Sequence, residues 1–328
     1  MSAKKSRRRP SRPRPPRAEA TEKAEPATVP RRPRLPFGSA LFGGGPSVMP
    51  GITRSLGRGL LTVASSPVLL AVAIVFPLLA WLALLAFGFE GSPARLVDVL
   101  ALPPISTYFD LGTGASLVGI GSAFLVYTAV GIAIRGILFA LLTGLIVDTL
   151  ERGHVTTYGL VRGARAIPTV LVVQVLSFSL IVAGNIVFPV LGPGIGFLAF
   201  VAALVGGLFF LGFAPAAAVR QGRPALESVR RSGRAAMLPG SKHLAFCALY
   251  FFIALPVVVG FAPGGSEITA NPTVFAWVFI LAVNVIHLAF MAALAYRWIV
   301  AEPSVPEEPV RRRQPAGRMT AARTRSRR

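Results

Sequence analysis

Apolar stretches of about 20 residues recur between Pro67 and Val300, and this is the length that a helix needs to cross about 30 Å of hydrocarbon. A backbone in hydrocarbon must pair its own polar groups, so each stretch is predicted to be a helix. Only 14% of the 328 residues are charged, against about 25% in a soluble domain. The predicted fold class is therefore all-α, a polytopic helical membrane protein with six transmembrane helices.

The six predicted spans lie within a transmembrane domain that covers 67–300. They are 67–87, a span that ends near Leu150, 169–190, 194–214, 244–262 and 273–299. In the sixth span, Trp277 lies near one end, and Tyr296 and Trp298 lie near the other. Aromatic residues at the two ends of a span are typical of membrane interfaces.

The formal net charge of +21 is unevenly distributed along the chain. Basic residues gather in both tails and in the segments 149–167 and 217–243, whereas the connectors 88–112 and 263–272 are mainly acidic. The positive-inside rule therefore predicts that both termini and both basic loops are cytoplasmic. Arginine far outnumbers lysine, a bias typical of a GC-rich bacterial genome, so the predicted location is the bacterial plasma (inner) membrane.

Both tails, 1–50 and 301–328, are rich in Arg and Pro and contain little that could form a core, which predicts disorder. Basic residues near a membrane attract anionic headgroups by about 1 kcal/mol each, so anionic membrane lipids are the expected partners. Nucleic acid is the weaker alternative for the N-terminal tail. Residues 51–66 are predicted to form an amphipathic helix that lies in the inner interface.

The second apolar stretch, 113–147, is too long for one perpendicular helix and contains Arg135. Dividing it at Arg135 would leave 136–147, which is too short to cross a bilayer, and would move later arginines outside. We therefore place the second span at about 127–148, with 113–126 as an outer extension, a tilted continuation or a re-entrant piece. Arg135 then lies in hydrocarbon, where a charge costs at least about 2.5–3.5 kcal/mol.

A charged residue at that depth predicts a functional site that faces the bundle interior or water. Asn284 and His287 share one face of the sixth span, and with Arg135 they are the candidate intramembrane polar site. A structural role is the alternative. In that case Arg135 would extend to the headgroups, and Asn284 and His287 would hydrogen-bond between helices.

Small residues repeat at a spacing of four, at Gly136, Ala140 and Gly144 and again at Ala202 and Gly206. Lipid tails are as apolar as leucine, so helices in a membrane associate through close backbone packing, which small residues permit. The pattern predicts packing within the chain, and a homodimer face is the alternative.

The two basic loops resemble each other at an offset of 69 residues, because 153–166 and 222–235 both read G-x8-R-x2-RA. Each follows a span that runs inward and precedes one that runs outward. We therefore predict a parallel internal repeat that relates spans 2–3 to spans 4–5. The candidate contacts with lipid headgroups or a cytoplasmic protein partner are Arg162, Arg165, Arg230, Arg231 and Arg234; control of topology alone is the alternative.

The loop motifs also resemble a family. Segment 153–155 (GHV) is similar to a G-x-V/I motif, and segment 225–234 (ALESVRRSGR) to an A-L-x-x-S-x-R-L motif, of bacterial six-span membrane proteins of unknown function. Those proteins are similar to the membrane domain that precedes the catalytic domain in some glycerophosphodiester phosphodiesterases. The resemblance covers about 51–300. The 27 polar residues at 302–328 cannot form a catalytic domain, so the resemblance implies neither phosphodiesterase activity nor catalytic residues.

The sequence contains no G-x-S-x-G motif, no metal-ligand spacing and no pair of acids within a span, so we predict no enzyme, no catalytic residue, no metal and no cofactor. The expected function is that of a lipid-associated structural or assembly protein. The alternative is a transporter or permease subunit with Arg135 in an anionic-substrate path. Glu227-Ser228-Val229-x3-Gly233 resembles part of the coupling loop of ATP-driven importer permeases, although the later I-x-L-P is missing.

Overall fold

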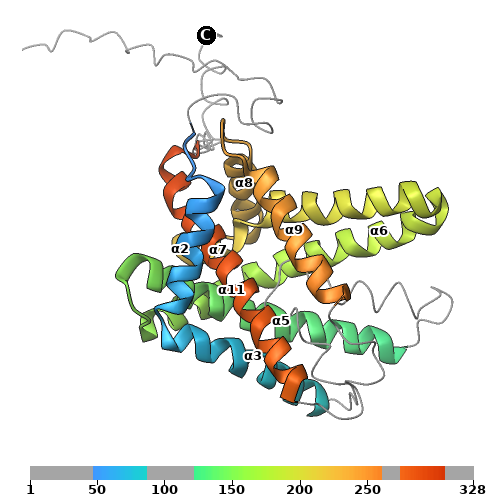
Figure 1. The fold of residues 1–328 in the computed structure, drawn as a ribbon, viewed down its shortest axis with the longest axis horizontal. Helices are drawn as coiled ribbons and strands as arrows, with labels where there is room; N and C mark the ends of the chain where they lie inside the picture. Colours follow the sequence, from blue (N-terminus) through green and yellow to red (C-terminus); the bar gives the residue numbers. More distant parts are fainter. Residues whose placement is uncertain (1–46, 87–121, 261–273, 307–328) are drawn as a thin grey trace, which may run out of the picture. The chain divides into compact units, whose positions relative to one another are not determined.

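The computed structural model describes residues 47–86, 122–260 and 274–306, which are helical apart from short turns (Figure 1). This confirms the all-α fold class. The connectors 88–112 and 263–272, most of the 113–126 segment and most of both tails lie outside the described residues. The helices are α2 (Ile52–Ala64), α3 (Pro67–Ala86), α5 (Ser122–Arg152), α6 (Thr157–Leu211), α7 (Ala214–Gln221), α8 (Ala225–Ala236), α9 (His243–Gly260), α11 (Val274–Ala301) and the 3-10 turn η3 (Glu302–Ser304).

Four helical stretches in the described ranges are long and apolar enough to cross a membrane, namely Ala129–Arg152, Thr157–Leu180, Gly194–Gln221 and Ala282–Ser304. A fifth is added if Ile52–Ala64 and Pro67–Phe76, which meet at 85°, are counted as one broken span. The apolar part of α9, His243–Ile253, is shorter than these candidate spans. The chain is thus a multi-pass membrane protein, and the number of six spans stays a prediction.

Helix α6 has 55 residues and is interrupted at Gly192, whose φ of 76° and ψ of 168° are not helical. A side chain strains a positive φ, and glycine does not. The chain reverses at this break (Figure 1). A Cβ added to Gly207, after the break, would lie 3.2 Å from the side chain of Leu180, before the break, so the two halves lie side by side. The predicted spans 169–190 and 194–214 are therefore two halves of one helical hairpin.

Close backbone packing joins α5 to the first half of α6. A Cβ on Gly144 would lie 2.2 Å from the carbonyl oxygen of Gly159, and one on Gly163 would lie 2.6 Å from that of Ala140. A Cβ on Gly136 would overlap the side chain of Leu171 on α6. The predicted packing within the chain is confirmed for this stripe, which α6 covers. In the second stripe Ala202 is exposed, and a Cβ on Gly206 would meet no described atom within 4 Å.

Helix α2 packs against α11 through small and polar residues. Its buried face is formed by Ser55, Gly59, Thr62 and Val63, and a Cβ on Gly59 would lie 2.2 Å from the carbonyl oxygen of Ala289 on α11. Leu60 and Leu61 are exposed, as are Arg54 and Arg58. The predicted helix is confirmed, and its position in the membrane interface stays a prediction.

Trp298 lies in the interior of the protein. Its side chain is fully buried, with its ring centroid 6.1 Å from that of Phe213, and it belongs to the main hydrophobic core. The predicted interfacial role of Trp298 is wrong, because the surrounding helices cover the whole indole and no part of it reaches the headgroup region. Tyr296, two residues earlier on α11, is half-buried.

The glycine contact between α5 and α6 predicts a large difference between two alanine substitutions in one helix. Gly144→Ala should lower the free energy of unfolding by about 1–3 kcal/mol, because its methyl group overlaps backbone atoms of α6. Gly131→Ala, where nothing lies within 4 Å, should leave stability unchanged or raise it by about 0.5–1 kcal/mol. Unfolding of the detergent-solubilised protein in dodecyl sulfate measures both. Equal stability of the two variants would contradict the packing.

Candidate functional site

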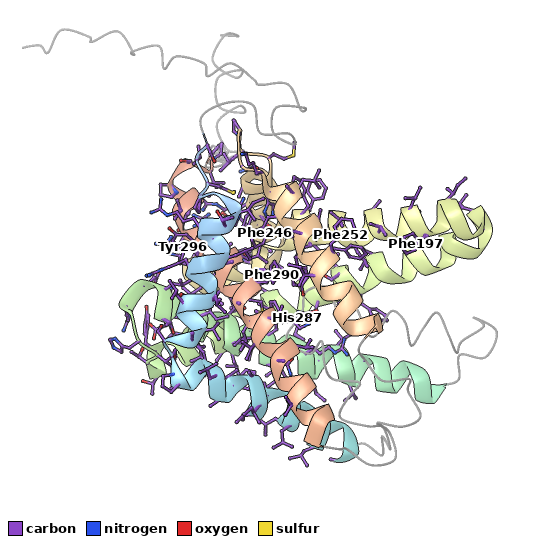
Figure 2. The ribbon with its side chains drawn as sticks, viewed as in Figure 1. Phe197, Phe246, Phe252, His287, Phe290 and Tyr296 are labelled. Carbon is purple, nitrogen blue, oxygen red and sulfur yellow. The ribbon has the colours of Figure 1, made fainter. Side chains whose placement is uncertain are left out.

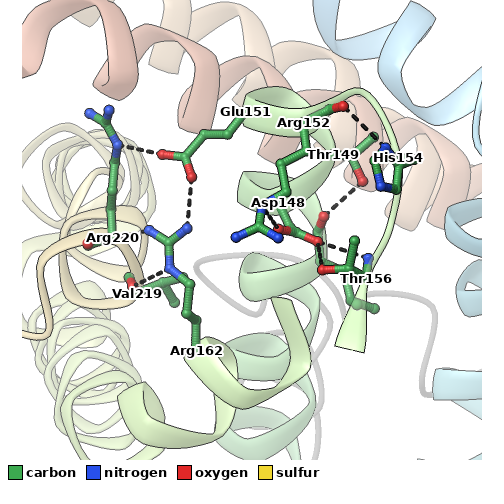
Figure 3. Close-up of polar contacts among 10 residues, drawn as sticks. Asp148, Thr149, Glu151, Arg152, His154, Thr156, Arg162, Val219 and Arg220 are labelled. Atoms are coloured by element: carbon green, nitrogen blue, oxygen red, sulfur yellow. Dashed lines mark hydrogen bonds and ion pairs between the residues drawn. The ribbon is translucent and has the colours of Figure 1, made fainter. Parts of the chain in front are cut away.

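The two basic loops are joined by shared ion pairs. Glu151, at the end of α5, accepts a hydrogen bond from Arg162 at 2.7 Å and one from Arg220 on α7 at 2.6 Å (Figure 3). Arg162 also donates to the carbonyl oxygens of Val219 and Arg220, each at 3.3 Å. The guanidinium of Arg162 thus connects α5, α6 and α7 at one point.

The same set of contacts continues to α8 and to the end of the described chain. Arg220 forms an ion pair with Glu302 of η3, and Gln221 donates a hydrogen bond to the same carboxylate. The side-chain oxygen of Gln221 accepts a hydrogen bond from Arg231 of α8 at 2.9 Å. We call these residues the ionic network: Glu151, Arg162, Arg220, Gln221, Arg231 and Glu302.

The five arginines predicted to contact headgroups or a partner therefore divide into two groups. Arg162 and Arg231 belong to the ionic network, with the Arg231 side chain buried, and Arg234 donates to the carbonyl oxygen of Pro306 at 3.3 Å. Arg165 and Arg230 are exposed. The structure thus leaves two of the five predicted contact residues with their side chains on the surface.

Each exposed arginine follows an exposed aliphatic residue by four positions. Val161 precedes Arg165 on α6 and Leu226 precedes Arg230 on α8, so each pair shares one helix face. Exposed Tyr158 lies one turn before Arg162, with the guanidinium groups of Arg152 and Arg162 at 4.4 and 5.4 Å from its ring centroid. A surface that combines aliphatic, aromatic and cationic groups is typical of the membrane interface.

The turn between α5 and α6 is held by Asp148, which sequence reasoning did not single out. Its carboxylate is fully buried and accepts hydrogen bonds from the backbone N–H and the hydroxyl of Thr156, at 2.8 and 2.6 Å (Figure 3). Its other oxygen pairs with Arg152 at 3.1 Å. Gly153 ends α5 with a φ of 81°. The one sequence signal for this role of Asp148 is its place as an acidic residue at the end of an apolar span.

Positions 69 residues apart make related contacts at the two loops. Gly153 and Gly222 both have positive φ angles, of 81° and 63°, and both follow the end of a helix. A Cβ on Gly144 would lie 2.8 Å from the backbone nitrogen of Gly163, and the equivalent residues, Phe213 and Ser232, are joined by a 3.1 Å hydrogen bond. These correspondences support the internal repeat, which stays a prediction.

Arg297, on α11, is a buried arginine that sequence reasoning overlooked. Its side chain is fully buried and donates hydrogen bonds to the carbonyl oxygens of Pro50, at 2.8 Å, and Ser241. It also contacts the hydroxyl of Ser55 at 3.3 Å, and its guanidinium carbon lies 5.0 Å from the ring centroid of Phe246. One side chain thus connects α2, α9 and the linker after α8 to α11.

Asn284 and His287 of the predicted polar site are both buried on α11. The Tyr250 hydroxyl of α9 lies 3.0 Å from Nδ1 of His287, and the facing side chains of α9 and α11 include Phe246 and Phe290 (Figure 2). Within the described residues, neither side-chain amide atom of Asn284 has a hydrogen-bond partner. Arg135 is half-buried on α5.

A recess lies where α5, α7, α9 and α11 meet, and Tyr250, which contacts His287, is part of its lining. Its cavity volume is about 20 Å³, which is room for about one water molecule. Its lining contains two polar side chains, Thr143 and Tyr250, and is otherwise apolar; the other residues are Phe139, Ile146, Gly212, Pro215, Ala216, Phe290, Met291, Leu294 and Ala295.

No family model, no curated protein and no solved structure matches this chain. Among the described residues, no group of three His, Cys, Asp or Glu side chains is placed to hold a metal ion. Inferences about function therefore depend on the geometry given above.

The ionic network predicts different outcomes for two arginines of one turn. Arg162→Gln should lower the free energy of unfolding by about 1–3 kcal/mol, because Glu151 and two backbone carbonyls lose a charged donor. Arg165→Gln removes the same charge from the surface and should change stability by less than about 0.5 kcal/mol. Unfolding in dodecyl sulfate measures both. A loss for Arg165→Gln as large as that for Arg162→Gln would argue against the network.

The contacts of Arg297 predict that its loss opens the protein around α9. Arg297→Met should cost about 2–4 kcal/mol, because buried carbonyl oxygens of Pro50 and Ser241 lose their donor. Cys247, the single cysteine of the chain, is fully buried and serves as the probe. Its modification by a maleimide should become faster in Arg297→Met and stay slow in the matched variant Arg54→Met. Equal protection of Cys247 in both variants would refute this role.

Proposed function

We propose that this protein is a multi-pass membrane protein without enzymatic activity, which binds anionic phospholipid headgroups through exposed arginines at its basic end. The observation that carries the proposal is the pairing of Arg165 with Val161 and of Arg230 with Leu226 on exposed helix faces. Each aliphatic side chain would lie among acyl chains, while the arginine extends to a phosphate.

We further propose that the basic end is cytoplasmic, in a bacterial inner membrane. The ionic network joins both basic loops. Separately, Arg234 of α8 donates to Pro306 and Arg297 of α11 donates to Pro50, and these two prolines adjoin the two tails. These contacts support a common side for both loops and both termini. Charge then favours the cytoplasmic side, where anionic lipids attract basic residues.

A structural or assembly role agrees with this arrangement, since a rigid basic end offers fixed contacts to lipids and to a cytoplasmic protein partner. Kinship with the membrane domain that precedes some glycerophosphodiester phosphodiesterases is part of the proposal and rests on segments 153–155 and 225–234. A permease subunit is the second candidate, and the buried polar pair of Asn284 and His287 is the observation in its favour.

The proposal predicts lipid-selective stabilisation. Short-chain phosphatidylglycerol should raise the unfolding temperature of the detergent-solubilised protein more than short-chain phosphatidylcholine does. The double variant Arg165→Gln/Arg230→Gln should need up to about 30-fold more phosphatidylglycerol for the same rise, since each arginine contributes about 1 kcal/mol.

The matched control is Arg165→Lys/Arg230→Lys, which keeps both charges and should retain most of the selectivity. The proposal fails if the two lipids stabilise the wild-type protein equally. It also fails if the glutamine variant responds to phosphatidylglycerol as the wild-type protein does.

A further inference from the structure

Helix α2 runs beside α11 (Figure 1), and its first turns lie toward the basic end of the protein. The Ser55 hydroxyl lies 3.3 Å from a guanidinium nitrogen of Arg297 on α11. One turn later, a Cβ on Gly59 would overlap the carbonyl oxygen of Ala289. Positions on α11 thus decrease as those on α2 increase, so the two helices are antiparallel. Because Glu302 follows α11 and belongs to the ionic network, the start of α2 lies nearest the network.

The outer face of α2 carries two arginines and then a leucine. Arg54 and Arg58 lie one turn apart and are exposed, and Leu61, one turn further along, is 63% exposed. Spacings of four and three place the three side chains on one helix face. The cations therefore lie toward the basic end and the apolar side chain lies further from it. A phospholipid presents its phosphate and its acyl chains in the same order.

The charges of Arg54 and Arg58 are not balanced by a carboxylate within the described part of the chain. The carboxylates there pair with other arginines; they are Asp148, Glu151, Glu227 and Glu302. The first turn of α2 contains Arg54 and no acidic residue. A cation in the first turn opposes the helix dipole, and two like charges one turn apart repel each other. An anion bound between the two arginines would relieve both effects.

Gly57 lies on the same face as the two arginines, and helix packing does not explain it. A Cβ added to Gly57 would meet no described atom within 4 Å, whereas one on Gly59, on the opposite face, would overlap backbone atoms of α11. Glycine inside a helix lowers its stability, so a contact is needed to account for it. At Gly59 that contact is α11. At Gly57 the missing side chain lets a group from outside approach the backbone beside Arg54 and Arg58.

A second copy of this chain is not the partner that the charges favour. Two parallel α2 helices related by a twofold axis would bring Arg54 and Arg58 of one copy against the same residues of the other. Four guanidinium groups would then repel one another across the contact. An anionic headgroup that approaches from the lipid meets the same two arginines with attraction only.

We propose that the outer face of α2 binds a phospholipid whose head is a phosphate monoester, as in phosphatidate. Arg54 and Arg58 can each donate two parallel hydrogen bonds. A monoester offers three acceptor oxygens and a charge of about −1.5 to −2, enough for two guanidinium groups. Its small head fits over Gly57, and an acyl chain passes Leu61. The surface is separate from Arg165 and Arg230 and does not depend on them.

The test is photo-cross-linking to the full chain in phosphatidylcholine nanodiscs. The probes are a phosphatidate and a phosphatidylglycerol, each with a diazirine in one acyl chain, and the labelled peptides are mapped by mass spectrometry. Phosphatidate should label 57–64 at least about fivefold more than 175–180, a segment of α6 whose exposed Val175, Leu176 and Leu180 report random contact with lipid. Phosphatidylglycerol should label the two segments within about twofold of each other.

Matched variants separate charge from space. Arg54→Gln/Arg58→Gln should lower the phosphatidate label in 57–64 to the level of 175–180. Gly57→Leu keeps both charges but fills the space beside them, and should lower the label at least about threefold. Gly131→Leu on α5, where a Cβ also meets nothing within 4 Å, should leave it unchanged. Arg165→Gln/Arg230→Gln should leave it unchanged too, so the proposed function and this inference can fail separately.

Competition in the wild-type protein gives a test that does not depend on whether a variant folds. Tenfold excess of unlabelled phosphatidate should displace the label from 57–64, whereas the same excess of phosphatidylglycerol or of inorganic phosphate should not. Equal competition by phosphatidylglycerol would overturn the preference for a monoester, and equal competition by inorganic phosphate would overturn the lipid as the ligand.

The proposal is also overturned if phosphatidate labels 57–64 of the wild-type protein no more than 175–180. Slow reaction of buried Cys247 with a maleimide shows which variants are folded. Unchanged label in a folded Arg54→Gln/Arg58→Gln or Gly57→Leu variant would refute the role of those residues and the proposal with it.

Discussion

An arginine that leaves water has to find acceptors within the protein, and the basic end of this molecule is built around that requirement. Arg162 lies between the Glu151 carboxylate and two carbonyl oxygens at the end of α7. Arg297 is fully buried and uses the carbonyl oxygens of Pro50 and Ser241 in place of an acid. Because these hydrogen bonds need acceptors at fixed positions, they hold the ends of α2, α7, α8 and α9 against α5 and α11.

The helices can bring these groups together only because their backbones approach closely. Gly144 and Gly163 place α5 and α6 in direct contact just before the network, and Gly59 does the same for α2 on α11 next to Arg297. In a membrane the hydrophobic effect does not drive helices together, so backbone contact and buried hydrogen bonds provide the attraction. The polar and the small residues of this chain therefore act together, and each makes the other's contacts possible.

The sequence predicts this fold to the level of its helices, since apolar length and glycine position are local signals. The break between the predicted spans 169–190 and 194–214 falls at Gly192. The role of each arginine depends on distant partners. Arg162 and Arg165 are three residues apart in one basic loop, and the contacts of Arg162 with Glu151, Val219 and Arg220 distinguish them. Arg297 adjoins Tyr296 and Trp298, which the sequence presented as interfacial residues, so its burial had no local signal.

The ionic network also bears on the proposed lipid recognition, which would use only a few of the arginines at a strongly basic surface. Arg162 and Arg231 hold α6 and α8 in place, and this fixes the helix faces on which Arg165 and Arg230 project. A side chain on a fixed helix loses less freedom on binding than one in a flexible tail, so each contact retains more of its favourable energy. The arginines inside the network and those outside it would thus contribute to one function in two ways, the first by positioning and the second by contact.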